Sequence, residues 1–291
     1  MAIALNDYRG RVLVTDGAWG TQLQQRGLPA GYCPELWNAE NPQAVEAVAR
    51  AYVEAGSEII LTNTFGANVP VLARHGAAGR LAELAEAGVA ISRRAAGSDV
   101  LVFASMGPTG RILMMEETAA DELYASFAAA ARAFADGGAD AVVLETMTEP
   151  AESALAARAV GETTDLPVIA SLTFGSGPEG IATMMGATPA DVVAALEGLG
   201  VGAFGANCGV GPESYVEVIG HYRRATEAPL WVKANAGLPV VKDGRNVFPL
   251  GPDAFAAFVP ALVSAGATFI GGCCGTTPAH IAAVRKAVDA L

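Results

Sequence analysis

Eight short apolar segments rich in β-branched residues recur along the 291-residue chain, and segments with helical signals separate them. Most of the eight are continuously apolar rather than alternating, which is typical of parallel strands covered on both faces. Parallel strands need a crossover between them, usually a helix, so this order predicts eight βα units. The predicted strands are residues 12–16, 58–62, 100–105, 141–145, 168–173, 203–207, 230–234 and 268–272.

Prolines mark where several of the predicted helices begin. Asn41-Pro42, Thr188-Pro189 and Thr277-Pro278 each place a capping side chain before a proline at the first helical position. Pro260 predicts a break in the helix that begins near Pro252. Residues 254–284 contain no Asp, Glu, Lys or Arg, but prolines and glycines interrupt them. This stretch therefore predicts helix, strand and loop rather than a membrane span.

Eight βα units without a linker or a low-complexity stretch predict a single-domain α/β fold, a (β/α)₈ barrel over residues 1–291. The alternative, an open doubly wound sheet, would usually show the glycine fingerprint G-x-G-x-x-G after its first strand. Residues 16–20, D-G-A-W-G, lack that spacing. In a barrel the catalytic groups follow the carboxyl ends of the strands, so the site is expected there.

Composition excludes several classes of protein. The chain has 18 basic and 30 acidic residues, a net charge of −12, which is the opposite of the basic excess of nucleic-acid-binding proteins. The apolar content of 52% is too high for a disordered chain. Four cysteines are too few for a disulfide framework. The N-terminus shows no signal peptide, so a cytoplasmic location is expected, without nucleic-acid or membrane partners.

Three of the cysteines follow predicted strands. Cys208 follows the sixth strand, and Cys273 and Cys274 follow the eighth, so the two strand ends lie about 10 Å apart with one strand between them. Three thiolates and one open position are typical of a catalytic zinc site. Adjacent residues of a strand point to opposite faces, so Cys273 and Cys274 can share a metal only if the strand has ended. Buried structural cysteines remain the alternative, which we favour for Cys33, and a vicinal disulfide is disfavoured in a reducing compartment.

Four segments carry a family resemblance. Residues 16–21 (D-G-A-W-G-T), 62–65 (T-N-T-F), 205–209 (G-A-N-C-G) and 271–276 (G-G-C-C-G-T) resemble the zinc-dependent homocysteine S-methyltransferases. That family includes the betaine and S-methylmethionine enzymes and the homocysteine-binding module of cobalamin-dependent methionine synthase. The resemblance extends from about residue 11 to residue 291, and residues 62–68 and 235–239 look closest to the module as a stand-alone barrel.

The resemblance implies a methyltransferase that converts homocysteine to methionine. It implies one Zn²⁺ held by Cys208, Cys273 and Cys274, with the homocysteine thiol as the fourth ligand. It also implies that Glu145 and the Asp16-Gly17 turn take part in holding the amino and carboxylate groups of homocysteine. For Asn235 we hypothesise that the side-chain oxygen occupies or approaches the fourth zinc position before homocysteine binds. Ordinary hydrogen bonding within the loop is the equal alternative for Asn235.

The methyl donor is less constrained. The chain is too short for folate, cobalamin and activation modules, so a methylated corrinoid on a separate protein, another folate-linked carrier and S-methylmethionine are the candidate donors. A betaine donor needs an aromatic cage for its quaternary ammonium, and Gly66 stands where we expect a cage tyrosine. Trp19, Trp37 and Tyr32 are the aromatic residues that would line a donor site.

Two alternatives belong to other functional classes. Lys233, near the end of the seventh predicted strand, would form a Schiff base in a barrel lyase. That mechanism leaves the cysteines unexplained. A zinc-binding module without catalysis is the second alternative, and the open coordination position disfavours it because structural zinc sites are normally closed by four protein ligands. The sequence leaves the oligomeric state open.

Overall fold

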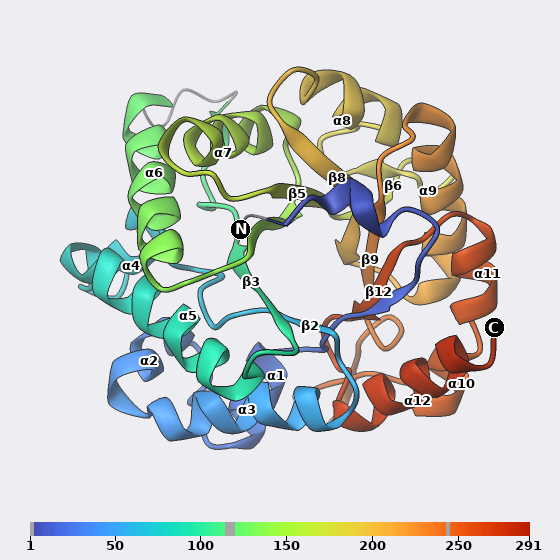
Figure 1. Ribbon diagram of the computed structural model, residues 1–291, viewed down its shortest axis with the longest axis horizontal. Coiled ribbons are helices and arrows are strands. Elements are labelled where there is room, and N and C mark those ends of the chain that lie inside the picture. Colours follow the sequence, from blue (N-terminus) through green and yellow to red (C-terminus); the bar gives the residue numbers. More distant parts are fainter. Residues whose placement is uncertain (1–2, 114–119, 243–244) are drawn as a thin grey trace.

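The described chain is a closed barrel of eight parallel strands surrounded by helices (Figure 1). The computed structural model describes residues 3–113, 120–242 and 245–291. The strand order is β1-β12-β9-β8-β5-β4-β3-β2, and a parallel bridge between Thr15 and Ile59 joins the two ends. This confirms the predicted (β/α)₈ barrel. The strands are β1 (Leu13–Val14), β2 (Ile59–Ile60), β3 (Leu101–Met106), β4 (Ala141–Met147), β5 (Val168–Leu172), β8 (Val201–Cys208), β9 (Leu230–Ala234) and β12 (Phe269–Gly272).

The helices form the outer layer, and several begin at the expected prolines. Thr188 caps its helix through a reciprocal pair of bonds with Asp191, whereas the Asn41 side chain makes no capping bond. The predicted break lies between α10 and α11, and Pro260 is the second residue of α11. The α-helices are α1 (Gly20–Gln25), α2 (Trp37–Glu40), α3 (Pro42–Glu54), α4 (Val69–Ala73), α5 (Leu81–Ala96), α6 (Ala120–Asp136), α7 (Pro150–Thr163), α8 (Pro189–Ala195), α9 (Pro212–Ala225), α10 (Pro252–Ala256), α11 (Val259–Ser264) and α12 (Pro278–Asp289).

Short 3₁₀ helices complete the helical segments, namely η1 (Leu5–Tyr8), η2 (Pro34–Leu36) and η3 (Ala78–Arg80). Residues 254–284 divide among α10, α11, β12 and α12, as expected from their prolines and glycines. Within the described ranges, no helix combines the length and the apolar character needed to cross a membrane.

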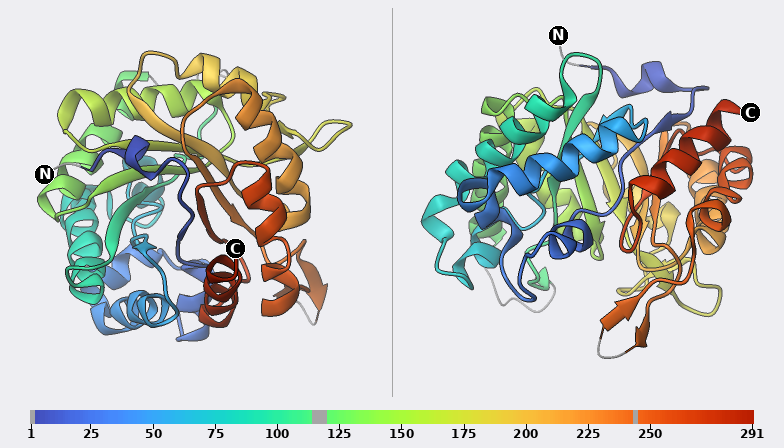
Figure 2. Two further views of the ribbon diagram at one scale, coloured as in Figure 1. Left: turned by 45° about the vertical axis from the view of Figure 1, so that its right-hand side comes forward. Right: turned by 90° about the horizontal axis from the view of Figure 1, so that it is seen from below.

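Two antiparallel hairpins were not predicted from the sequence. Strands β6 (Phe174–Ser176) and β7 (Ala182–Thr183) pair after β5, and β10 (Val240–Lys242) and β11 (Arg245–Val247) pair after β9. Both hairpins project from the same end of the barrel (Figure 2). Their strands of two or three residues are too short to show a clear alternation, and Met184 and Val241 beside them are exposed.

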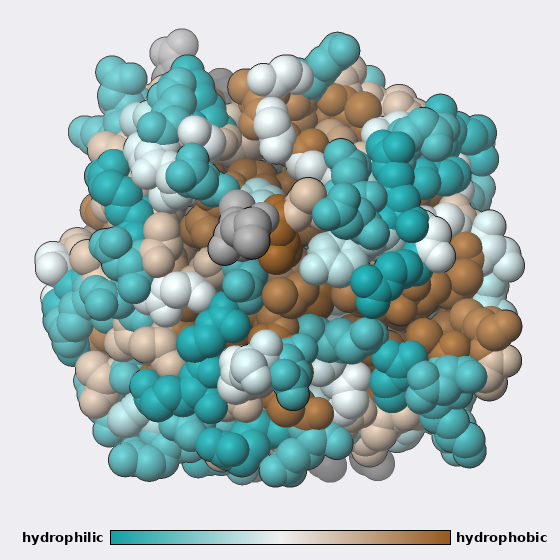
Figure 3. All heavy atoms as spheres, in the orientation of Figure 1, coloured by the Kyte–Doolittle hydropathy of each residue, from teal (hydrophilic) through white to brown (hydrophobic). Residues whose placement is uncertain are grey.

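The barrel has one apolar core inside the sheet and another between the sheet and the helices. Inside, Trp231 lies against Phe103 and Phe269, with ring centroids 6.2 and 5.6 Å away. The 3₁₀ helix η1 covers the amino end, where Leu5 joins the inner core. Figure 3 shows this end, with hydrophilic residues over much of the outer ring and hydrophobic residues toward the barrel axis.

A polar layer lies directly above the inner core, toward the carboxyl ends of the strands. Because side chains alternate along a strand, residues two positions beyond Phe103, Val143 and Trp231 also point inward. These positions carry polar side chains, and each is buried. The residues that form the polar layer are Ser105, Glu145, Ser171, Asn207 and Lys233. The functional site is therefore built on an apolar base.

We predict that Phe103→Ala destabilises the barrel by about 3–5 kcal/mol, because it leaves a cavity in a closely packed interior. Phe103 is fully buried, and its ring stacks on Trp231. Urea unfolding followed by circular dichroism measures the change. The control is Val241→Ala, whose side chain is 76% exposed, and which should alter stability by less than about 0.5 kcal/mol. Equal stability of the two variants would contradict the assignment of Phe103 to the inner core.

Candidate metal centre

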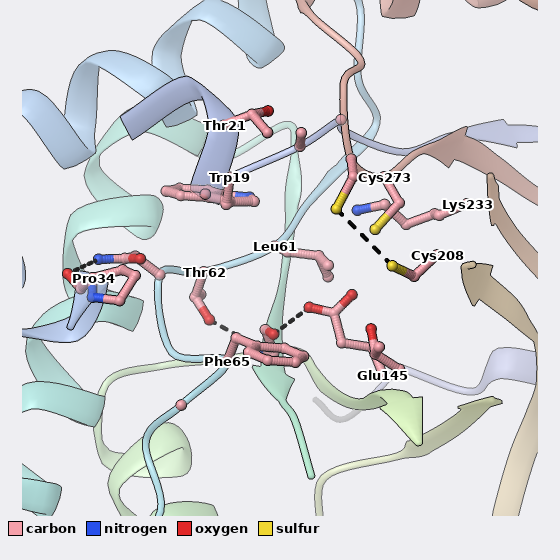
Figure 4. Close-up of a pocket in the computed structure, with 18 of the residues that line it drawn as sticks. Trp19, Thr21, Pro34, Leu61, Thr62, Phe65, Glu145, Cys208, Lys233 and Cys273 are labelled. Carbon is pink, nitrogen blue, oxygen red and sulfur yellow. Dashed lines mark hydrogen bonds between the residues drawn. The ribbon is translucent and has the colours of Figure 1, made fainter. Parts of the chain in front are cut away.

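A pocket of about 300 Å³ opens at the carboxyl end of the barrel, above the polar layer (Figure 4). Three members of the polar layer, Ser105, Glu145 and Lys233, line it from below. Trp19 and Phe65 line it from the loops after β1 and β2. In Figure 4, Cys208 and Cys273 lie across the pocket from Trp19. The predicted location of the site, beyond the carboxyl ends of the strands, is thus where the pocket lies.

The three rim cysteines converge, as the sequence predicted. The sulfur atoms of Cys208, Cys273 and Cys274 all lie within 4.8 Å of one another, and those of Cys208 and Cys274 are 3.9 Å apart. Tetrahedral zinc with bonds of ~2.3 Å to sulfur places its ligand sulfurs about 3.8 Å apart. Strand β12 ends at Gly272, which frees both following cysteines to face the same point. The spacing of the thiols therefore fits a single Zn²⁺.

The fourth cysteine has a different role. Cys33 is buried, and its thiol donates a hydrogen bond of 3.1 Å to Glu35 Oε2. Burial, followed by the charge of Glu35, raises the pKa of Cys33 to about 12. All four cysteines are free thiols, so no vicinal disulfide joins Cys273 to Cys274. The structure thus separates Cys33 from the other three, in agreement with the structural assignment.

The backbone around Cys208 is held in an unusual conformation. Cys208 has a φ of +63°, a left-handed conformation that few residues other than glycine adopt, and Gly209 follows with a φ of +61°. The Tyr215 hydroxyl lies 2.7 Å from the Cys208 carbonyl oxygen and 2.9 Å from that of Asn207, and donates to them. Such conformations persist where the surroundings fix them, and they concentrate at functional sites. Here the turn directs the Cys208 thiol toward the other two.

A second set of bonds fixes the loop after β12. The Cys273 backbone N–H donates to the Ala234 carbonyl oxygen at 2.7 Å. The Thr276 hydroxyl donates to the Cys273 carbonyl oxygen at 2.7 Å and accepts from the Ala18 N–H at 3.0 Å. One hydroxyl therefore connects the cysteine loop to the loop after β1, so both walls of the pocket are fixed relative to each other.

Mutual contacts and burial raise the pKa of each thiol in the cluster. A hydrogen bond with Cys273 lowers the pKa of Cys208, but a bond with Cys274 and burial raise it, to about 12. A bond with Cys208 lowers the pKa of Cys274, but its contacts with Cys273 and its burial raise that pKa to about 12. A bond with Cys208, together with burial, raises the pKa of Cys273 well above its usual range. Since zinc binds thiolates, metal binding must release these protons, and zinc affinity falls as the pH is lowered.

Asn235 follows β9, and the backbone N–H of the next residue, Ala236, donates to the Cys274 carbonyl oxygen at 3.0 Å. The Asn235 side-chain nitrogen donates to the Gly209 carbonyl oxygen at 3.2 Å. Its side-chain oxygen is buried and has no hydrogen-bond partner among the described residues. A buried amide oxygen without a partner is costly, and a Lewis acid beside it removes that cost. The three adjacent thiols form a donor set suited to Zn²⁺. Asn235 is not among the residues that line the pocket, and its approach to the metal stays a prediction.

The predicted substrate-binding residues occupy two levels. Glu145 lines the pocket and accepts a hydrogen bond from the Ser105 hydroxyl. Burial raises the pKa of Glu145, and the charge of Lys233 partly offsets this increase. Gly17 also lines the pocket and has no space for a side chain, because a Cβ atom would lie 2.7 Å from the Tyr52 hydroxyl.

Asp16 lies beneath this lining. Its carboxylate is fully buried and pairs with the Lys233 ammonium. It also accepts bonds of 2.7 Å from the Trp19 indole and from the Leu61 backbone N–H. No sequence pattern indicates that these two groups meet, since Asp16 and Lys233 are separated by 217 positions. The buried ion pair also disfavours Lys233 as a Schiff-base nucleophile, which must be a neutral amine.

Asn207 is a site residue whose role the sequence did not reveal. Its side-chain oxygen accepts from the Thr146 N–H at 2.8 Å and from the Ser171 hydroxyl at 2.7 Å. Its side-chain nitrogen donates to the Thr146 hydroxyl at 2.7 Å. These bonds connect β8 to β4 and β5 just before Cys208. Side chains alternate between the two faces of a strand, and this alternation, which places Glu145 and Lys233 inside the barrel, also identifies Asn207 as an inward-facing residue.

We predict that the protein binds about one zinc ion per chain and that Cys208→Ser lowers this content sharply, because a tetrahedral site loses one of its three protein sulfurs. Metal analysis after dialysis against a weak chelator measures the change. Cys33→Ser is the matched control, since Cys33 is equally a free thiol but contacts Glu35 instead. Full zinc content in Cys208→Ser, or loss in Cys33→Ser, would refute the assignment of the centre.

Comparisons with known proteins agree with this geometry. A model of the family described as homocysteine S-methyltransferase matches residues 13–288. The chain is 36% identical over 301 residues to methionine synthase of Mycobacterium tuberculosis and 35% identical to that of Mycobacterium leprae, with 96% of the chain covered in each. It spans only about a quarter of the length of these relatives, 25% and 24%.

A solved structure resembles nearly the whole chain. The metallated form of the homocysteine methyltransferase MmuM from Escherichia coli superposes with a TM-score of 0.78 at 27% identity, covering 94% of this chain and 96% of that one. Its apo form superposes with a TM-score of 0.75, covering 98% of each chain. With the barrel and the three converging thiols, the family match over residues 13–288 establishes that this chain belongs to the homocysteine S-methyltransferase family.

Proposed function

We propose that this protein transfers a methyl group to the thiol of homocysteine and so forms methionine. The observation that carries the proposal is the group of three thiols within 4.8 Å of one another at a pocket that also presents charged side chains. Cys208, Cys273 and Cys274 would hold Zn²⁺, which leaves one position for the substrate sulfur. Residues 1–291 would act as one homocysteine-binding domain, and the reduced thiols suit the expected cytoplasmic location.

The chain's own residues prepare the acceptor for reaction. When bound, zinc keeps the substrate sulfur as a thiolate, the reactive form of a thiol. Glu145 would receive the substrate ammonium, and Ser105 orients the Glu145 carboxylate through its hydroxyl. Gly17 lets the substrate approach the backbone of the loop after β1. Asp16 would act indirectly, through Lys233 and Trp19, because it lies beneath the pocket lining.

Asn235 would complete the metal coordination before the acceptor binds. Its unpartnered, buried side-chain oxygen supports this role. Asn235 would offer the metal an amide oxygen, which is a weaker ligand for zinc than a thiolate. The protein would in this way hold its metal in the resting state without closing the site permanently.

The donor side of the pocket favours S-methylmethionine or a methylated corrinoid over betaine. At Gly66, a Cβ atom would lie 2.9 Å from Val71 Cγ1 and 3.0 Å from Glu35 Oε1, so no cage tyrosine fits there. Of the three aromatic residues expected near a donor, Trp19 lines the pocket. Trp37 belongs to the outer core, and the Tyr32 hydroxyl donates to Glu40 at 2.6 Å. A separate corrinoid protein therefore remains a candidate partner.

We predict that the zinc-loaded protein forms methionine from homocysteine with S-methylmethionine or a methylated corrinoid, and not with betaine. Cys208→Ser should lower kcat/KM by more than about 100-fold, since loss of even outer-shell metal partners costs 10–100-fold. Cys33→Ser should keep the wild-type rate. Chromatographic assay of methionine with each donor provides the measurement. Methionine formation with none of the donors, or with betaine alone, would contradict the proposal.

A second prediction concerns Asn235→Ala. If the Asn235 oxygen is the resting ligand, this variant should lose zinc faster than wild type in the absence of substrate and at the wild-type rate with homocysteine bound. Competition with a chromogenic chelator measures both rates. An equal acceleration in both states would instead assign Asn235 to loop structure alone.

A further inference from the structure

The pocket extends beyond the cysteines to a second end, which lies on the other side of the barrel. This end is lined by Pro34 and Glu35, before β2, and by Asn63 and Gly66, after β2. Three strands separate β2 from β8 in either direction around the closed barrel, β1, β12 and β9 on one side and β3, β4 and β5 on the other. In Figure 4, Pro34 and Cys208 accordingly lie on opposite sides of the pocket. An acceptor sulfur at the cysteines leaves this end for the methyl donor.

Glu35 places a carboxylate at this end without a cationic partner. Only 2% of Glu35 is exposed. Its Oε1 accepts from the Gly66 N–H at 2.6 Å, and its Oε2 accepts from the Cys33 thiol at 3.1 Å. A carboxylate has about four acceptor positions, so some remain for another group. None of the ion pairs among the described residues includes Glu35. A buried carboxylate without an opposite charge is costly, and a cationic ligand in the pocket offsets that cost.

Asn63 adds a second acceptor on the same wall. Its side-chain nitrogen donates to the Pro34 carbonyl oxygen at 2.7 Å and to the Asn38 side-chain oxygen at 2.8 Å. These bonds use both N–H groups and fix which side of the amide carries the oxygen. The Asn63 side-chain oxygen itself accepts no hydrogen bond from the described residues, and Asn63 lines the pocket. A carboxylate and an amide oxygen together suit a cation with several N–H donors, such as an ammonium.

A sulfonium donor that is also an amino acid carries two positive charges, and only one of them suits Glu35. The sulfonium lies at the acceptor sulfur and loses its charge as the methyl group leaves. A carboxylate against it would stabilise the donor more than the transition state and would slow the reaction. The ammonium keeps its charge throughout, so a carboxylate can bind it without raising the barrier. In S-methylmethionine three carbon atoms separate the two groups, which lets the ammonium extend away from the cysteines.

We propose that Glu35 and Asn63 form a subsite for the ammonium group of an amino-acid sulfonium donor such as S-methylmethionine. The inference rests on the proposed function and selects among its donors. In the reaction the acceptor sulfur bonds to the methyl carbon while the bond from that carbon to the donor sulfur breaks. The electron pair of the broken bond stays on the donor sulfur and neutralises it, and the acceptor thiol proton is released to solvent. Homocysteine and S-methylmethionine thus yield two molecules of methionine.

The test compares two sulfonium donors on the zinc-loaded protein at saturating homocysteine. They are S-methyl-L-methionine and 4-(dimethylsulfonio)butanoate, which lacks only the amine. Wild type should use S-methylmethionine with a kcat/KM about 10- to 100-fold higher, the range for one hydrogen bond to a charged group. Glu35→Gln should remove this preference by raising the KM for S-methylmethionine. Its kcat should stay near wild type, because the ammonium is bound equally in the ground state and the transition state.

Two controls separate donor recognition from folding. Glu40→Gln removes an exposed carboxylate that accepts a hydrogen bond from the Tyr32 hydroxyl, and it should leave the donor preference unchanged. Glu35→Gln should keep the zinc content and the homocysteine affinity of wild type, because the cysteine end of the pocket is not altered. Metal analysis and titration calorimetry with homocysteine measure these two properties.

The outcomes distinguish this inference from the proposed function. Equal kcat/KM of wild type for the two sulfonium donors would overturn the subsite without any variant. A preference that Glu35→Gln retains, or an equal loss with both donors, would also overturn it. Methionine formation from methylcobalamin but from neither sulfonium would refute the subsite and leave the proposed function standing. If wild type binds no homocysteine and forms methionine with none of these donors, the proposed function itself fails, and the inference fails with it.

Discussion

The alternation of side chains along eight parallel strands is the constraint on which the rest of this structure depends. The same inward-facing positions carry Phe103, Val143 and Trp231 at one level and Ser105, Glu145 and Lys233 at the next. The lower level excludes water and supplies most of the burial inside the barrel. The upper level can therefore hold charged groups at fixed positions in a dry environment, where electrostatic interactions are strong. The three cysteines follow this level by one to three residues, where the strands end.

The three cysteine sulfurs converge only because the chain leaves regular strand geometry at the ends of β8 and β12. A continuing strand would direct Cys273 and Cys274 to opposite faces, and β12 stops at Gly272. On β8, Cys208 adopts a left-handed conformation that Tyr215 holds through the carbonyl oxygens of residues 207 and 208. The left-handed conformation of Cys208 costs backbone energy, which the surrounding contacts must offset. This local loss of stability places three sulfur atoms where they can bind one ion.

The sequence predicted what depends on local patterns and missed what depends on distant contacts. Apolar runs located all eight barrel strands, and their ends placed Cys208, Cys273 and Cys274 on one rim. The left-handed turn at Cys208 has no residue signature, since glycine is the usual sign of such a turn. The Asp16–Lys233 pair joins the loop after β1 to β9, which are separated in the sheet only by β12, and no spacing rule connects residues 217 positions apart in the sequence. The hairpins after β5 and β9 are too short for a periodic pattern.

The buried Asp16–Lys233 pair is difficult to explain by stability. Removing two opposite charges from water costs several kcal/mol per ion, and apolar replacements of such pairs are often neutral or stabilising. An apolar side chain at position 233 would extend the inner core, which ends at Trp231, two residues before Lys233. Its position accounts for the pair, since Asp16 holds the Lys233 ammonium where Lys233 lines the pocket beside Glu145 and the cysteines. On this view the ion pair keeps a cation at a fixed position at the pocket, and the water around that cation has already been removed during folding.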